Sequence, residues 1–510
     1  MEAFFLGIDI GTSSCKAILF DEKGREAAAA SSGYPIYRSG PIGAAEQDPH
    51  EIWQAVCDAV VRLRLSPEQR SKLAALSISS QISSHFFVDG DHRPLTRIVS
   101  WMDRRASTEA AEMKRAFSPT ELRRLLGATL PAGASWPVPK LKWFNRYRPG
   151  IIERANYIVQ PKDWVLWKMT GQWKTDVSSL RGIVHQQTKK ACLPLLEWAG
   201  VSPRIVPPSG EPWEVVGQLL PHAAEALRLP VSLPVVLGWN DLNAAVLGLL
   251  GSEETIGFDM TGTSEHIGIV VSGNDEAAGA EPGINRIFFT GDKDLVYGVT
   301  SSGGYALQWF ASQVFRSRAD ESEYETIMEA AAAVTAGSEQ LLFLPYLQGE
   351  RSPWWNPDAK GVFFGLSPKH DRSHMARAVL EGVGFALKAI YVRLGRWPST
   401  IRIAGGASKM KVWNGMKANI LGVPVQTLET SEAGCLGAAM LAAYGTGAYA
   451  TLEQAAAEMT RVKDICDPVE PIRRFYEDRY PYFEELYHTL EPLFEKTSRL
   501  KPLQEGGVRP

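Results

Sequence analysis

The chain has 510 residues, of which 45% are hydrophobic and 22% are charged, and its formal net charge is −3. This composition is typical of a globular protein, and the charge gives no reason to expect nucleic acid or an anionic membrane as a partner. The length predicts two domains of about 250 residues each. No apolar run is long enough to span a membrane, and the five cysteines are scattered singly, so free thiols and a cytoplasmic location are expected.

The first elements predict an α/β unit that begins antiparallel. Residues 7–20 read as strand, tight glycine turn and strand, and residues 25–30 return as a third strand. Asp48 is a suitable N-cap for the helix that follows, and residues 73–79 and 85–88 read as strands. No G-x-G-x-x-G opens a helix after the first strand and no G-x-x-x-x-G-K-[ST] occurs, which excludes two common nucleotide-binding folds.

A candidate catalytic base closes the first half of the chain. In residues 235–245 an apolar strand ends near Gly238, and Asn240 and Asp241 precede a helix of small residues. A carboxylate at the carboxyl end of a strand faces the cleft of an α/β domain, where it can accept the proton of a reacting hydroxyl. The alternative role for Asp241 is that of a helix N-cap, and the two roles are compatible.

The second half, from about residue 251, repeats the first hairpin. Residues 257–264 match residues 7–14, and both segments turn through Gly-Thr-Ser, as Gly11, Thr12 and Ser13 and again as Gly262, Thr263 and Ser264. Backbone N–H groups of such glycine turns approach anions closely, although Gly-Thr-Ser is also ordinary hairpin chemistry. Two copies predict a duplicated domain that holds a nucleoside triphosphate between its halves. Asp9, two residues before the first turn, is placed to hold Mg²⁺ through waters.

Later elements complete the expected nucleotide domain. Residues 301–304 turn into an apolar helix, a longer helix is expected over residues 373–394, and a strand over 400–404 ends in Gly405 and Gly406. Adenine can lie against the backbone there, unless those glycines form only an ordinary turn. A helix of small residues begins near Ala433, and an aromatic helix follows residue 460. No low-complexity linker separates the halves, so a tight hinge is expected.

Two further patterns carry weaker signals. His370 and His374 have the spacing of two metal ligands on a helix, but no acidic residue completes an H-E-x-x-H motif, which favours surface imidazoles. Most tryptophans are expected in the core. Trp136, in the segment 133–137, is the tryptophan best placed to stack on a sugar face.

Taken together, the chain resembles the FGGY carbohydrate kinases over roughly residues 4–450. The segment 345–353, Pro-Tyr-Leu-Gln-Gly-Glu-Arg-Ser-Pro, continued by 361–366 and 376–382, is similar to the family's C-terminal signature. Residues 101–105, Trp-Met-Asp-Arg-Arg, are similar to its W-x-D-x-R segment, and residues 139–143 and 161–164 resemble N-terminal signatures. The resemblance implies an α/β fold of two actin-like (ribonuclease-H-like) domains around a cleft for ATP and a sugar.

The resemblance also implies roles for residues. Asp241 is the expected catalytic base, and Asp9 the carboxylate near Mg²⁺ and the phosphates. The nucleotide is expected to contact the two hairpin turns and Thr12, Thr263, Gly304, Gln308, Gly405 and Gly406. The expected domains are residues 1–250 for the sugar, residues 251–460 for the nucleotide, and residues 461–510 as a helical tail. The expected partners are ATP, Mg²⁺ and a small sugar or polyol, without nucleic acid or membrane, and a homodimer is one expected assembly.

The xylulokinase branch is nearest in pattern, with one departure. Where that branch carries Gln-Met-His-Gly beside the sugar, this chain has Gln81, Ile82, Ser83 and Ser84; the expected sugar site also includes Asp103, Trp136, Asn240 and Asp241. A neutral acceptor of about five carbons, with D-xylulose accepted, is favoured because serine is shorter and less basic than histidine. The alternatives are gluconate, glycerol or another polyol, an actin-like or chaperone-like ATPase without acceptor, and a sugar sensor that has lost catalysis.

Overall fold

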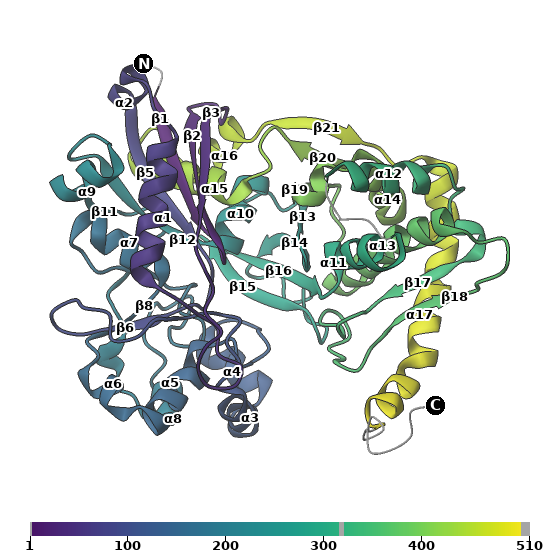
Figure 1. Cartoon of the computed structure of the whole chain (residues 1–510), viewed down its shortest axis with the longest axis horizontal. Helices are drawn as coiled ribbons and strands as arrows, with labels where there is room; N and C mark the ends of the chain where they lie inside the picture. The colour runs from purple at the N-terminus through teal and green to yellow at the C-terminus, as the bar shows by residue number, and fades with distance from the viewer. Residues whose placement is uncertain (1–2, 316–320, 501–510) are drawn as a thin grey trace, which may run out of the picture.

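The computed structural model describes residues 3–315 and 321–500. Two α/β domains lie side by side, the N-terminal one on the left and the C-terminal one on the right of Figure 1. The long helix α17 (Glu470–Ser498) runs along the far edge of the C-terminal domain.

Each domain is built on one mixed sheet. In spatial order, the strands of the N-terminal sheet are β11 (Val215–Gln218), β12 (Pro234–Asn240), β5 (Leu73–Ser80), β1 (Phe4–Ile10), β2 (Ser14–Asp21) and β3 (Glu26–Gly33). Those of the C-terminal sheet are β15 (Asn285–Thr290), β16 (Lys293–Thr300), β14 (Glu265–Ser272), β13 (Ile256–Thr261), β19 (Thr400–Gly405), β20 (Val425–Leu428) and β21 (Val462–Cys466).

The two sheets repeat one topology, which confirms the predicted duplication. β1 pairs antiparallel with β2 and parallel with β5, and β13 pairs antiparallel with β14 and parallel with β19. A third antiparallel strand and a second parallel strand flank each set, and an antiparallel strand closes the parallel side of each sheet. Three antiparallel strands followed by parallel strands are the arrangement expected of the actin-like, ribonuclease-H-like fold.

Helices cover both faces of each sheet. The N-terminal half contains α1 (Pro49–Arg62), α2 (Pro67–Ser71), α3 (Ser107–Ala116), α4 (Pro119–Leu126), α5 (Pro137–Tyr147), α6 (Pro149–Arg154), α7 (Pro161–Thr170), α8 (Leu193–Ala199), η1 (Pro203–Ile205), α9 (Pro221–Leu227) and α10 (Asp241–Leu250). The C-terminal half adds α11 (Gly303–Phe310), the π-helix η2 (Ala311–Phe315), α12 (Glu321–Ala332), η3 (Ser338–Gln340), α13 (Arg372–Leu394), η4 (Gly406–Lys409), α14 (Lys411–Leu421), α15 (Ala433–Gly445) and α16 (Leu452–Met459).

Four small two-stranded sheets lie outside the main sheets. They pair β4 (Glu46–Gln47) with β7 (Ile98–Val99), β6 (Phe86–Val88) with β8 (Tyr157–Val159), β9 (Thr175–Asp176) with β10 (Ser209–Gly210), and β17 (Leu342–Pro345) with β18 (Gly361–Phe364).

The two domains meet where α10 and α15 cross between the sheets (Figure 1). A Cβ on Gly437 of α15 would lie 1.8 Å from the carbonyl oxygen of Ala244, and one on Gly248 of α10 would lie 2.2 Å from that of Ala433. On its other side α15 presses on β1, where a Cβ on Gly7 would lie 1.9 Å from the Cys435 carbonyl. The small-residue helix expected from the sequence therefore permits backbone contact on two sides.

A second contact joins the domains at the edge strand β15. Thr129 and Arg286 form an antiparallel bridge, and the backbone N–H of Phe288 donates to the Gln186 side chain at 2.9 Å. Trp239, near the end of β12, stacks on Phe289 with ring centroids 5.0 Å apart. Both contacts lie on the side of the molecule where β12 ends, so they fix how the two sheets face each other.

Local predictions hold in most places. Helix α1 begins at Pro49, and the Asp48 carboxylate accepts the His50 N–H at 2.8 Å, as expected of an N-cap. The segment expected as a helical tail differs, because it starts with β21, an exposed edge strand that pairs with β20. The cysteines are free, and four of the five are buried.

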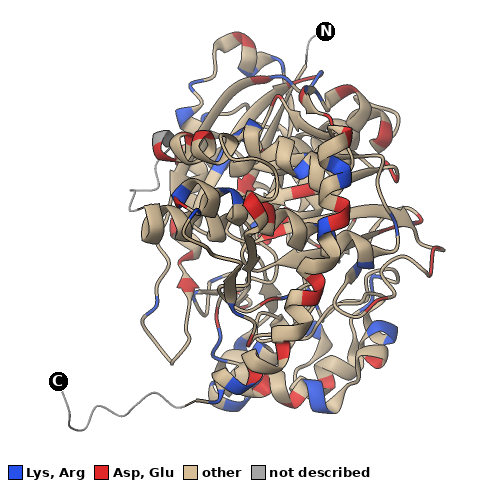
Figure 2. Cartoon of the chain, turned by 90° about the vertical axis from the view of Figure 1, so that its right-hand side faces the viewer, with Lys and Arg blue, Asp and Glu red and all other residues tan. Residues whose placement is uncertain are grey.

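Charges of both signs are interspersed along the ribbons on the side that carries α17 (Figure 2). Within residues 3–315 and 321–500, no helix is long and apolar enough to cross a membrane.

His370 and His374 lie at the start of α13. The Asp371 side chain accepts the backbone N–H of Ser373 at 2.9 Å, and the His374 ring contacts the same carboxylate at 2.7 Å. The His370 ring accepts the backbone N–H of Ser367 at 2.9 Å. His374 thus takes part in capping α13, whereas His370 holds the loop that precedes the helix.

Candidate active site

The first hairpin turn is held from two sides. Gly11 closes it by donating its backbone N–H to Ser14 at 3.0 Å. The Gln47 side chain donates to the Thr12 carbonyl at 2.6 Å, and the indole of Trp101 donates to the Thr12 hydroxyl at 3.0 Å. Ser13 is exposed at the tip. The turn therefore has a fixed backbone and an open outer face.

The second turn is braced by the N-terminus of α11. The backbone N–H of Gly304 donates to the Gly262 carbonyl at 2.8 Å, and that of Tyr305 donates to Thr263 at 3.1 Å. A Cβ on Gly304 would lie 2.6 Å from the Gly262 carbonyl oxygen, so only glycine fits this contact. Gly262, Thr263 and Gln308 are exposed. A glycine turn beside the positive end of a helix favours anions.

The end of β19 presents an open stretch of backbone. Gly405 has φ of +93°, and a Cβ there would lie 2.1 Å from the Thr261 carbonyl oxygen, whereas no heavy atom lies within 4 Å of the Cβ position of Gly406. The Thr261 hydroxyl accepts the Ala407 N–H at 2.9 Å and pins the strand end. The chain continues as the short helix η4, and α14 begins only at Lys411.

Asp9 lies at the end of β1, two residues before the first turn. It is partly exposed, and its carboxylate accepts the Ser79 hydroxyl at 2.7 Å. Burial raises the pKa of Asp9, while the Ser79 hydrogen bond and the charge of Lys16 oppose the rise. The Lys16 ammonium is itself held by Glu432 at 2.6 Å. One oxygen of Asp9 therefore stays available to a ligand.

The equivalent aspartate of the second hairpin is not available. Asp259 is 1% exposed and pairs at 2.7 Å with Lys417, which also contacts Glu265. Within the described residues no group of three or more His, Cys, Asp or Glu side chains could hold a metal ion. A Mg²⁺ that keeps most of its waters and binds phosphate oxygens needs only one or two carboxylates, and Asp9 fits that requirement.

Asp241 occupies the first position of α10 and does not cap it. The Asn240 side chain is the cap, since its oxygen accepts the backbone N–H of Asn243 at 3.0 Å. Burial, together with the charge of Asp9, raises the pKa of Asp241 to about 7, while the backbone N–H groups of Leu242 and Ile82 and the charge of Arg181 oppose the rise. A partly exposed carboxyl with such a pKa can accept a proton near neutral pH.

A buried polar chain fixes Asn240. Lys162 lies 3.0 Å from Asp163 and 3.2 Å from Asp176, and Asp176 accepts the Ser178 hydroxyl at 2.6 Å. The Ser178 oxygen in turn accepts the Asn240 amide at 2.7 Å. These side chains are at most 3% exposed. The signature lysine at 162 thus positions the residue next to the candidate base.

The segment 81–84 lies beside Asp241, as expected, but most of it is buried. Gln81 is 1% exposed and bonded to Gln47 at 2.9 Å and to Ser84 at 3.0 Å. Ser83 is 2% exposed at φ +66°, and its hydroxyl has no protein partner. Only Ile82 is partly exposed, and its backbone N–H reaches Asp241.

Two expected sugar-site residues lie in the interior. Asp103 is fully buried, with its carboxylate bonded to the Arg105 guanidinium and to the Ala45 N–H at 2.8 Å. Trp136 is 1% exposed and packs within the hydrophobic core. In this conformation both side chains are buried, and their contact with the sugar stays a prediction.

The structure also brings forward residues that the sequence did not single out. Arg181 lies near Asp241, and its guanidinium bonds Tyr297 of β16. Arg351, quoted only as part of a signature, and Arg181 both act on His266, because their charges and, above all, its burial lower the pKa of His266 to about 3. Nothing in the local sequence marks Arg181, which sits in an irregular loop.

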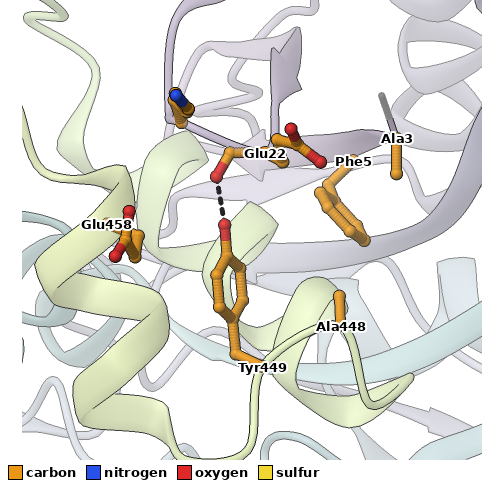
Figure 3. Close-up of a pocket in the computed structure, with 7 residues that line it drawn as sticks. Ala3, Phe5, Glu22, Ala448, Tyr449 and Glu458 are labelled. Carbon is orange, nitrogen blue, oxygen red and sulfur yellow. Dashed lines mark hydrogen bonds between the residues drawn. The ribbon is translucent and has the colours of Figure 1, made fainter. Parts of the chain in front are cut away.

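A separate cavity of about 190 Å³ lies at the opposite end of β1 from Asp9 (Figure 3). Phe5, Glu22, Tyr449 and Glu458 are among its lining residues, and the Tyr449 hydroxyl donates to the Glu22 carbonyl. Its position separates it from both hairpin turns.

Two ribonuclease-H-like domains, each with a glycine turn after the first strand of the repeated set, place the protein in the actin-like class of folds. The N-terminal domain description of the FGGY family of carbohydrate kinases matches residues 4–248, and the C-terminal domain description matches residues 260–446. The chain belongs to this family and is an ATP-dependent carbohydrate kinase.

Relatives and solved structures agree with this assignment. The chain is 30% identical to a xylulose kinase and 31% identical to a gluconokinase, both of Bacillus subtilis, over 95% and 96% of this chain and 97% of each relative. Among solved structures it is similar to a gluconate kinase from Lactobacillus acidophilus, with 26% identity, TM-score 0.87 and coverage of 98% of this chain and 100% of that one. A ligand-bound xylulose kinase from the same organism gives 26% identity and TM-score 0.87, over 97% of this chain and 100% of that one.

Proposed function

We propose that Asp241 takes the proton from a primary hydroxyl of a small sugar while that oxygen attacks the γ-phosphate of ATP. The observation that carries the proposal is at the start of α10, where Asn240 caps the helix and the neighbouring Asp241 is left partly exposed. The pKa of Asp241, raised to about 7 by burial and by Asp9, suits a base that works near neutral pH.

The two turns hold the nucleotide in this proposal. The exposed backbone at 11–13 and 262–264 receives the phosphates, since glycine turns let N–H groups approach anions. Gly304 and Gln308 extend the second turn along α11, and adenine lies on the open backbone at Gly405 and Gly406. Phosphoryl transfer needs chiefly such positioning and charge stabilisation, which fixed turns supply.

Asp9 is the proposed residue for Mg²⁺. When bound, the ion neutralises charge on the phosphate oxygens. Ser79 keeps the carboxylate of Asp9 oriented toward the cleft through its hydrogen bond of 2.7 Å. Burial raises the pKa of Asp9, and a bound cation would lower it.

The acceptor is proposed to bind between Asp241 and the segment 81–84, in a cytoplasmic enzyme. The named relatives include both xylulose kinases and gluconokinases, so ketopentoses and sugar acids are the first candidates. The partly exposed Ile82 and the unpartnered Ser83 hydroxyl are the groups of this segment nearest to a ligand's position.

The test is ADP release measured with and without acceptors, over a panel of pentuloses, polyols and aldonic acids. A kinase releases ADP at a rate that depends on one acceptor and is low without any. ADP release of equal rate in the absence of every acceptor would contradict the proposal and indicate an ATPase.

A further inference from the structure

Arginines from both domains approach the space beside Asp241. Arg181 comes from the loop between β9 and α8 and bonds Tyr297 of β16 in the other domain. Arg351 comes from the C-terminal domain, and its guanidinium reaches the Ser301 hydroxyl at 3.4 Å. Arg104 adds an exposed charge within range of Arg351. Cations therefore gather at one side of the candidate base.

These arginines differ in their partners from Arg105, Arg286 and Arg377. Arg105 pairs with Asp103 at 2.7 Å, Arg286 with Asp294 at 2.7 Å, and Arg377 with Glu381 at 2.7 Å. Over residues 3–315 and 321–500, by contrast, no ion pair joins Arg104, Arg181 or Arg351 to a carboxylate, and the buried Nε of Arg181 has no hydrogen-bond partner. A buried guanidinium N–H without a hydrogen-bond partner is costly, unless a ligand supplies the acceptor.

Hydrogen bonds and a close contact hold the loop at Arg181. Its backbone N–H donates to Ser179 at 3.0 Å, and the Ser179 hydroxyl donates to Asp176 at 2.5 Å. The next residue, Gly182, has φ of +86°, and a Cβ there would lie 2.8 Å from the ring of Trp136. The Trp136 ring thus packs against the loop at Gly182 and holds the loop in position. A guanidinium held in this way can recognise one anion in one place.

The position of Arg181 points to the acceptor side of the cleft. Its partner Tyr297 is paired with Gly268, four residues along β14 from Ser264 of the second turn. Four residues of strand span about 13 Å, so this contact lies well away from the turn proposed for the phosphates. Arg181 is nonetheless close enough to Asp241 for its charge to act on that carboxyl.

We propose that the acceptor is a sugar acid of about five or six carbons, whose carboxylate is bound by Arg181 while its reacting hydroxyl lies at Asp241. This inference rests on the proposed function and replaces the neutral acceptor that the sequence alone favoured. Arg351 adds a second positive charge on the same side, and the Tyr297 hydroxyl orients the guanidinium of Arg181. A planar guanidinium binds a carboxylate through two parallel hydrogen bonds, which a hydroxymethyl group cannot accept in the same way.

The experiment compares matched acceptors on three proteins. Each aldonate is paired with the polyol that has a hydroxymethyl group in place of its carboxylate, as gluconate with glucitol and xylonate with xylitol. Wild type, Arg181→Gln and the exposed-surface control Arg70→Gln are assayed for kcat/KM, and aldonate binding without ATP is measured by calorimetry. We expect an aldonate to be preferred over its polyol at least tenfold, and Arg181→Gln to lower aldonate kcat/KM and affinity by about 10²-fold with KM for ATP unchanged. Arg70→Gln should match wild type.

Three results would overturn the inference while leaving a working kinase. The first is a higher kcat/KM for the polyol than for its aldonate. The second is an equal fall of kcat/KM for aldonate and polyol in Arg181→Gln, which would place Arg181 on the phosphoryl group. The third is unchanged aldonate binding in that variant. Absence of acceptor-dependent ADP release with every compound would instead overturn the proposed function itself.

Discussion

The side-chain oxygen of Asn240 accepts the backbone N–H of Asn243 at 3.0 Å, so the residue before Asp241 caps α10. A helix needs one such cap. Because Asn240 provides it, the Asp241 carboxylate is not needed as the cap. The same Asn240 donates to Ser178 at 2.7 Å, which ties the cap to the buried chain from Lys162. The helix start and the candidate base are therefore held by one residue.

Replacing Asn240 separates capping from positioning. Asn240→Ala should lower the free energy of unfolding by about 1 kcal/mol through loss of the cap and should also lower kcat. Asn240→Ser keeps an oxygen that can cap the helix but is too short to donate to Ser178, so stability should largely return while kcat stays low. Urea unfolding and steady-state kinetics measure the two effects. Full activity in both variants would show that Asn240 does not position Asp241.

The raised pKa of Asp241 predicts a dependence of stability on pH. The folded-state pKa is about 7 against an ordinary value of 3.8. Between these values the folded protein binds the proton more readily than the unfolded chain, so the free energy of unfolding falls as the pH rises. Asp241→Asn removes this pH-dependent contribution to stability. The variant should melt at a higher temperature than wild type near about pH 8, and the difference in melting temperature should shrink toward about pH 4. A variant less stable than wild type at the higher pH would contradict the assigned pKa.

The buried ion cluster of Asp259, Glu265 and Lys417 predicts a large stability effect. All three side chains are at most 1% exposed. Lys417→Met leaves two carboxylates buried without a cation and should cost about 3–5 kcal/mol in urea unfolding. Lys411→Met, at the exposed start of α14, is the control and should change stability by less than about 0.5 kcal/mol. Equal changes in the free energy of unfolding in the two variants would mean that removing the cation from this cluster costs no more than a surface substitution.

The crossing of α10 and α15 predicts a site that tolerates no side chain. A Cβ at Gly437 would lie 1.8 Å from a backbone carbonyl, which cannot move aside as a side chain can. Gly437→Ala should destabilise the protein by about 1–3 kcal/mol or more. Gly415→Ala, in α14 with no atom within 4 Å of the added Cβ, should stabilise by up to about 1 kcal/mol. In thermal melting, we expect the melting temperature to fall in Gly437→Ala and to rise in Gly415→Ala.

Features set by local pattern were predictable from the sequence. The duplicated hairpin, the capped helix at Asp48 and the small-residue helix at Ala433 each depend on residues close together in the chain. The edge strand β21 was missed because Lys463 and Asp464 interrupt its apolar residues and most of the strand is exposed, so no alternation of buried and exposed positions marks it.

The details of the site needed the fold. Capping by Asn240 or by Asp241 depends on which side chain turns back to the helix, which composition cannot decide. Asp103 and Trp136 sit in loops whose burial comes from distant elements, so their interior positions were not readable. Arg181 gains meaning only from Tyr297 and Asp241, which lie far away in the sequence.

The most direct test of Asp241 as the base is single-turnover phosphoryl transfer to the best acceptor in Asp241→Asn. The control is Asp478→Asn, which makes the same change on the exposed face of α17. We predict that Asp241→Asn lowers the transfer rate by about 10²–10⁴-fold while ATP affinity stays within about twofold, because the carboxylate addresses the acceptor. The control should transfer phosphate at the wild-type rate. Retention of more than about half of the wild-type rate by Asp241→Asn would contradict the account and leave this carboxylate without a catalytic role.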